Sequence, residues 1–193
     1  MKNLKLILFL GILLLSNINK GYTMQSMMGN TNLSDNTYDS LKIMGAAKLS
    51  NVIITENLDI LGPTTLTNNS KIEGKINVVG PINLRSVTLN TGRVVGPFDA
   101  ENLKVSGELN IVGTVDCNNC KFKSPLVITS KKCSFKDSEM ESLRILKDGE
   151  KATQKIYLRG KTTVHGDIIC EGKNVEIVLD EGAKVLGNVT KGK

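Results

Sequence analysis

Apolar residues recur in pairs along most of the chain, with the two members of each pair two positions apart. Residues at this spacing lie on the same face of a β-strand. Each repeat holds three such pairs, which predicts three short strands separated by turns. One β-branched residue from each repeat marks the steps of 16 to 21 residues, and these are Ile43, Ile60, Val78, Val94, Ile111, Ile128, Ile145, Val164 and Val185.

Glycine follows these marker residues at a fixed distance. Seven of the nine markers have glycine two positions later, namely Gly45, Gly62, Gly80, Gly96, Gly113, Gly166 and Gly187. Glycine tolerates positive φ, so we expect it at the first corner of each unit. Stacked three-strand units of this length form a triangular β-solenoid. The sequence therefore predicts an all-β fold, a single-stranded parallel β-helix of about eight to nine coils of roughly 17 residues over residues 41–193.

Two units depart from the pattern. In the sixth, Ser130 and Lys132 replace a glycine and an apolar residue, which indicates a shift of register. In the seventh, residues 147–151 are polar and predict a corner that loops out. The composition agrees with an aliphatic core, because aromatic residues make up only 4% of the chain and Trp is absent.

The N-terminus has a different character. Lys2 and Lys5 precede an apolar run over residues 6–16, which is typical of a secretory signal peptide and too short for an ordinary membrane span. We expect residues 1–23 to be a signal peptide or membrane anchor, and the polar residues 24–40 to be a flexible linker. Loss of Lys2, Lys5 and Lys20 with this segment lowers the net charge from +6 to +3. The low net charge and the small number of aromatic residues argue against nucleic acid as a partner.

The final repeats resemble a known family. Residues 162–168 and 183–189 read small-x-aliphatic-x-Gly-x-aliphatic, which resembles the coil of bactofilins. These are cytoplasmic, polymer-forming proteins of the bacterial cytoskeleton, and the resemblance implies a solenoid that polymerises end to end. The exported N-terminus departs from the family. The left-handed hexapeptide acyltransferases also place three pairs in each coil, but their repeat is a strict six residues, and the handedness here stays open.

The four cysteines offer little chemistry. Cys117 and Cys120 form a C-x-x-C that falls on two inward positions, where we expect structural thiols and not a redox or metal site. Cys133 lies in the next coil, which allows a disulfide with Cys117 or Cys120 in an oxidising compartment. Cys170 is expected on the same ladder as Cys117, three coils away. No cofactor is expected.

Two acidic residues are the weak candidates for catalysis. Asp99 and Asp116 occupy the same position in adjacent units, so we expect them to stack about 5 Å apart on the outside. Repulsion between them needs a cation, a lysine or a proton. β-Helical enzymes that act on polysaccharides use stacked acids, although no third acid or neighbouring arginine is evident. His165, the only histidine, is expected at the surface.

Lysines gather in the fifth and sixth units, and we expect them to form one basic patch for an anionic glycan or a membrane surface. They are Lys121, Lys123, Lys131, Lys132 and Lys136. The leading hypothesis is a non-enzymatic, exported solenoid of the cell envelope, periplasm or extracellular space that self-associates through its ends. The alternatives are a glycan- or surface-binding adhesive module and a carbohydrate-active β-helix enzyme.

Overall fold

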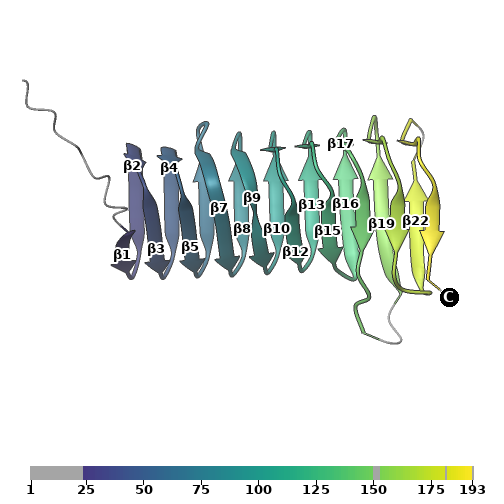
Figure 1. The fold of residues 1–193 in the computed structure, drawn as a ribbon, viewed down its shortest axis with the longest axis horizontal. Helices are drawn as coiled ribbons and strands as arrows, with labels where there is room; N and C mark the ends of the chain where they lie inside the picture. The colour runs from purple at the N-terminus through teal and green to yellow at the C-terminus, as the bar shows by residue number, and fades with distance from the viewer. Residues whose placement is uncertain (1–23, 150–152, 181, 193) are drawn as a thin grey trace, which may run out of the picture.

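The computed structural model describes residues 24–149, 153–180 and 182–192, which form a rod of stacked three-strand coils (Figure 1). All strand pairs are parallel, and the rod has about ten turns roughly 17 residues apart. The described residues contain only strands, turns and loops. The predicted all-β parallel β-solenoid is thus confirmed. No helix in the described part of the chain is long and apolar enough to cross a membrane. The predicted signal peptide or anchor lies outside the described residues.

The strands form three faces of the rod. The first face holds β1 (Met24–Met28), β3 (Ser40–Met44), β5 (Asn57–Leu61), the second halves of β7 (Lys71–Val79) and β9 (Thr88–Val95), β12 (Leu109–Val112), β15 (Leu126–Thr129), β18 (Leu143–Ile145), β21 (Ile168–Cys170) and β24 (Val189–Lys191). The second face holds the first halves of β2 (Thr31–Tyr38) and β4 (Ala47–Ile54), then β6 (Thr64–Thr67), β8 (Ile82–Arg85), β10 (Phe98–Glu101), β13 (Val115–Asn118), β16 (Lys132–Lys136), β19 (Gln154–Arg159) and β22 (Val175–Leu179). The third face holds the remaining halves of β2, β4, β7 and β9, then β11 (Lys104–Val105), β14 (Lys121–Phe122), β17 (Glu139–Met140), β20 (Thr163–Val164) and β23 (Lys184–Val185).

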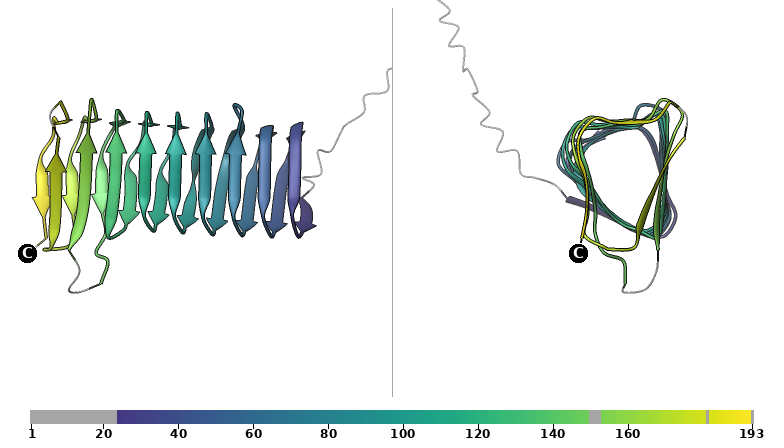
Figure 2. Two further views of the ribbon diagram at one scale, coloured as in Figure 1. Left: turned by 180° about the vertical axis from the view of Figure 1, so that it is seen from behind. Right: turned by 90° about the vertical axis from the view of Figure 1, so that its right-hand side faces the viewer.

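The core is a set of ladders along the rod axis. Leu41, Leu58 and Ile76 stack in register on the first face and are completely buried. Each fully buried aliphatic side chain of this kind contributes roughly 1.5–3 kcal/mol. Phe122 and Phe135 add an edge-to-face contact, with ring centroids 6.4 Å apart. The coils superimpose closely when the rod is seen along its axis (Figure 2), so the ladders run nearly straight.

The first corner, between the first and second faces, depends on glycine in five consecutive coils. The glycines from Gly45 to Gly113 have φ between +140° and +146°, which side chains rarely adopt. A Cβ atom on Gly80 would lie 2.5 Å from the carbonyl oxygen of Gly62. The sequence interpretation of these five corner glycines is confirmed.

The second corner, between the second and third faces, has a different conformation that the sequence analysis missed. One residue there has φ near +50° in coil after coil, joined in the third coil by Asn69 at +61°, and these residues are Asp35, Asn51, Asn68, Ser86, Asn102, Asn119 and Asp137. Asn and Asp tolerate this left-handed region better than other non-glycine residues. Their side chains also form a ladder, because the Asn51 amide donates to Asp35 at 2.8 Å and the Asn119 amide donates to Asn102 at 2.6 Å.

The expected linker over residues 24–40 is wrong. Most of this segment forms β1 and β2, which pair with β3 and β4 and make one more coil than predicted. Met27, Leu33 and Tyr38 pack against the core from this first coil. Its polar composition has a physical reason, because among the described residues this coil is covered by a neighbouring coil on one side only.

The register predicted for the last two units is also wrong. Val164 and Val185 stack on Met140 at the third face, not on Ile145 of the first face. Gly166 and Gly187 therefore lie at the third corner and have no positive φ. The cause is the predicted looped-out corner: the chain leaves the rod after Ile145 and returns at β19, which displaces every later position (Figure 1).

Candidate functional site

The two candidate aspartates lie side by side on the outside of the second face. Asp99 on β10 and Asp116 on β13 are direct register partners in adjacent coils. Both side chains point outward because Phe98, Ala100, Val115 and Cys117, which alternate with them, are buried. The stacking expected from the sequence is thus present in the structure.

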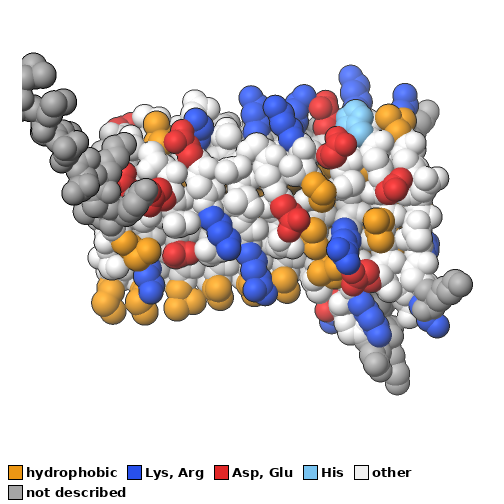
Figure 3. Space-filling model, in the orientation of Figure 1, with side chains coloured by type: hydrophobic (Ala, Val, Ile, Leu, Met, Phe, Trp, Pro, Cys, Tyr) orange, Lys and Arg blue, Asp and Glu red, His pale blue; other side chains and the backbone are white. Residues whose placement is uncertain are grey.

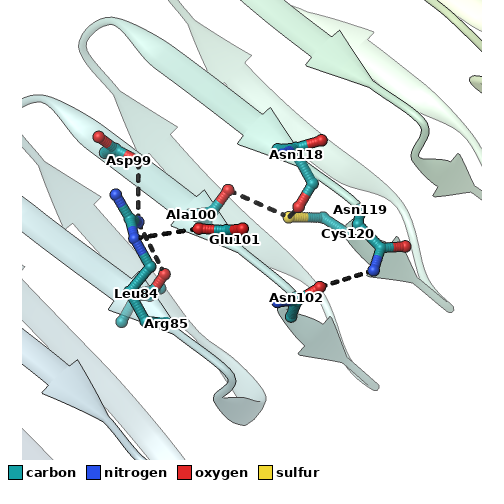
Figure 4. Close-up of polar contacts among 9 residues, drawn as sticks. All are labelled: Leu84, Arg85, Asp99, Ala100, Glu101, Asn102, Asn118, Asn119 and Cys120. Atoms are coloured by element: carbon teal, nitrogen blue, oxygen red, sulfur yellow. Dashed lines mark hydrogen bonds and ion pairs between the residues drawn. The ribbon is translucent and has the colours of Figure 1, made fainter.

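An arginine, which the sequence analysis did not find, stands beside this acidic stack. The Arg85 guanidinium on β8 donates to the Asp99 carboxylate at 3.0 Å and lies 3.4 Å from the Glu101 carboxylate (Figure 4). A hydrogen bond to the Leu84 carbonyl oxygen at 3.0 Å also orients it. Arg85 therefore supplies the cation that relieves repulsion between stacked carboxylates. The sequence places Arg85 one coil before Asp99, and this spacing was the signal that could have identified the ion pair.

Cationic and polar side chains continue this surface toward the C-terminus. Asp99 and Asp116 border a shallow hollow of about 400 Å³ that Lys132, Ser134 and Arg159 also line. The Arg159 guanidinium lies 4.9 Å from the centroid of the Tyr157 ring and 3.5 Å from the Asp180 carboxylate. Within the described residues Asp116 has no ion-pair partner. The hollow thus presents a free carboxylate between cationic groups.

The five lysines do not form one patch. Lys132 and Lys136 lie on the second face, whereas Lys121 and Lys123 belong to the third face and Lys131 precedes β16 at the first corner. Lys121 is also paired with Glu139 at 3.1 Å. The prediction of a single basic patch is therefore wrong, because the chain passes two corners between β14 and β16, and strands that are close in sequence lie on different faces.

The cysteines are buried and free in the structure. Cys117 stacks on Phe135, and Cys133 stacks on Val115, so Cys133 is not on the Cys117 ladder. Cys170 belongs to the first face and stacks on Ile145, which corrects its expected position. The proposed disulfide from Cys133 to Cys117 or Cys120 is not formed.

Three of the four thiols lie in an environment that favours their protonated form, whereas a hydrogen bond with Cys117 lowers the pKa of Cys120. Burial raises the pKa of Cys117 well above its usual value and raises the pKa of Cys133 to about 12. The Cys120 thiol lies 3.4 Å and 3.5 Å from the carbonyl oxygens of Asn118 and Ala100 (Figure 4). Buried thiols with a raised pKa, such as Cys117 and Cys133, are poor nucleophiles and poor metal ligands.

No other cluster suggests metal chemistry. Among residues 24–149, 153–180 and 182–192 there is no group of three or more His, Cys, Asp or Glu side chains that could hold a metal ion. His165 is exposed, and its backbone amide donates to the Met140 carbonyl oxygen at 2.9 Å.

Comparisons with known proteins do not narrow the chemistry, since no family model, curated protein or solved structure matches the chain. The chemistry of the site therefore follows from its own side chains. Its acids and cations lie on a flat, open strand face and can hydrogen-bond the hydroxyl or charged groups of an extended ligand.

Proposed function

We propose that this protein is an exported, non-enzymatic structural element of the cell envelope or extracellular space that polymerises end to end in the manner of bactofilins. The observation that carries the proposal is the exposed backbone and core at each end of the rod. Within the described residues β1 pairs only with β3, and β24 pairs only with β21. Strands of this kind are ready templates for another chain.

The side chains at the ends support the same function. Met27, Leu33 and Tyr38 are only partly buried at one end, as are Ile177 and Val185 at the other. A second rod stacked on either end extends the aliphatic ladders and completes the strand pairing. Most coils have a similar cross-section, which favours such stacking (Figure 2).

A charged side chain at the end of the core tests this proposal. In Leu33→Glu a carboxylate faces the next rod, and the control variant Lys104→Glu places a carboxylate, with a larger change of net charge, in the middle of the exposed third face. We expect wild type and Lys104→Glu to form filaments in negative-stain images, and Leu33→Glu to sediment as shorter species. Single rods of wild type at the highest soluble concentration, at both low and high salt, contradict the proposal.

A second candidate function is binding of a glycan, favoured by the hollow beside Asp116. The Asp116 carboxylate, the Ser134 hydroxyl and the Arg159 guanidinium offer both hydrogen-bond acceptors and donors to a polar chain. Binding of an acidic polysaccharide that weakens steeply with ionic strength supports this function. Binding that is unchanged in Arg159→Gln argues against it.

A further inference from the structure

One edge of the rod carries apolar side chains in six consecutive coils, exposed in the first four coils and half-buried in the last two. They precede the glycines of the first corner and form what we call the apolar ridge, which consists of Met28, Met44, Leu61, Val79, Val95 and Val112. Met28 is 82% exposed, Leu61 54% and Val79 52%. Figure 3 shows hydrophobic side chains in a row along the lower edge of the N-terminal half of the rod. A continuous exposed apolar row marks an interaction surface.

The ridge is widened by small apolar residues and bounded by polar columns. Ala46, Pro63, Pro81 and Pro97 follow the corner glycines. On the first face, the neighbouring outward column contains Lys42, Asp59, Asn77, Arg93 and Asn110. On the second face, the neighbouring outward column contains Lys48, Thr65, Asn83, Asp99 and Asp116.

We propose that the apolar ridge binds the ridge of a second copy of this chain, with the two rods antiparallel and a two-fold axis at Val79. The ridge presents one apolar side chain per coil, at the strand spacing of about 4.8 Å. A second copy matches this repeat from Met44 to Val112, and Met28 lies opposite the partner's Thr129. A two-fold contact uses the same patch on both molecules, so the ridge needs no other partner surface.

The bordering charges select the antiparallel arrangement centred on Val79. In this register Asp59 faces the partner's Arg93, and Lys48 faces the partner's Asp116, each twice because of the two-fold axis. None of these four charges has an ion-pair partner within the described part of the chain. Complementary charges at the border of an apolar contact fix its register.

Other registers bring like charges together. A parallel, in-register pair places Lys42 opposite the partner's Lys48, because both lie in the second coil. An antiparallel pair shifted by half a coil toward the N-terminus places Lys42 opposite the partner's Arg93. Such juxtapositions are unfavourable, whereas the register centred on Val79 contains none along the two columns.

The projecting corner gives an independent reason for the same register. Residues 146–149 leave the rod at the first corner, on the edge that carries the ridge and one coil beyond Thr129 (Figures 1 and 3). With the two-fold axis at Val79, the first coil of one rod faces the seventh coil of the other. The projection of each rod then lies just past the end of its partner. Any deeper overlap drives the projection into the partner's first coil.

Cross-linking of the full chain tests the register. Val79→Cys lies on the two-fold axis and should give a disulfide-linked dimer with a mild oxidant. Leu61→Cys and Val95→Cys should cross-link weakly alone and strongly when mixed, because each faces the other. The four native cysteines are buried, and wild type is the control for them. Self-cross-linking of Leu61→Cys as strong as that of Val79→Cys, or no dimer in any variant, overturns the proposal.

An exchange of the charges at positions 59 and 93 tests the contact through the equilibrium constant of dimerisation. We expect Arg93→Asp and Asp59→Arg each to weaken dimerisation about tenfold, which corresponds to about 1.4 kcal/mol. The double variant should restore it. Arg144→Asp lies in the same column but outside the overlap, and it should leave the dimer unchanged. Failure of the double variant to recover in sedimentation equilibrium contradicts the pairing.

The same variants distinguish other partners of the ridge. Leu33→Glu, which blocks stacking at the rod end, should retain the Val79→Cys cross-link, since Val79 lies three coils away from Leu33 at the centre of the lateral contact. Flotation of the full chain with anionic phospholipid vesicles that is lost in Leu61→Gln, without any Val79→Cys dimer, identifies a membrane surface and overturns the proposal.

Discussion

The two halves of the rod close the same corner in different ways. From the second to the sixth coil, a glycine with φ near +140° makes the first corner, and its amide pairs with the next coil, as in Gly80 to the Val95 carbonyl oxygen at 2.9 Å. In the seventh coil, which is the sixth unit of the sequence analysis, Ser130 replaces glycine. Its hydroxyl donates to the Lys132 carbonyl oxygen at 2.9 Å. The first half closes this corner with backbone conformation, whereas the seventh coil closes it with a buried polar side chain.

The difference shows what a coil requires. In the eighth coil the chain leaves the rod entirely, and Gln154 closes the gap by donating to the carbonyl oxygens of Ser130 and Leu146, both at 2.9 Å. Each coil contacts only its neighbours, so one irregular corner does not disturb the rest. The three strands and their inward ladders define the fold, and the corner needs only satisfied backbone groups.

The largest effect is expected from an alanine at a regular corner. Gly80→Ala forces a Cβ atom against the Gly62 carbonyl oxygen at a φ of +142°, and we expect a loss of about 3 kcal/mol in the free energy of unfolding. Urea unfolding followed by circular dichroism measures this loss. Gly149→Ala is the matched control in the projecting corner, where nothing lies within 4 Å, and it should cost about 1 kcal/mol or less. Equal losses contradict the comparison.

A smaller effect is expected at the polar corner. Gln154 is 2% exposed, and Gln154→Leu leaves two carbonyl oxygens without their donor, which should cost about 2 kcal/mol. Thr153→Val, at the exposed neighbouring position, should be close to neutral in the same unfolding experiment. A Gln154→Leu protein as stable as wild type shows that the polar side chain does not hold this corner.

The regular half was predictable because its signals coincide. The aliphatic pairs and corner glycines such as Gly62 repeat at one spacing, and both follow from local geometry. The first coil was missed because Asn, Ser and Thr hide the alternation in residues 24–40. The register of Val164 was missed because an insertion has no fixed length, and only strand pairing shows where the chain rejoins the rod.

The candidate site was predictable only in part. Equal spacing placed Asp99 beside Asp116 correctly. Arg85 was missed because it occupies the next outward column, so its ion pair depends on side-chain reach and not on the repeat. The lysines were misplaced because nearness in sequence says little about nearness across a corner, as Lys121 and Lys132 show.

The smallest effect is expected from the exposed ion pairs, and it should again differ between the halves. Arg85→Gln leaves Asp99 next to Asp116 without its cation, and we expect a loss of about 0.5–1 kcal/mol at low salt that shrinks as salt screens the carboxylates. Arg144→Gln breaks the 2.6 Å pair with Glu171, where no stacked acid lies beside it, so its loss should be smaller and less dependent on salt. Urea unfolding of both variants at low and high ionic strength measures the difference. Equal losses with the same salt dependence show that repulsion between the stacked aspartates does not contribute, and that Arg85 is an ordinary surface arginine.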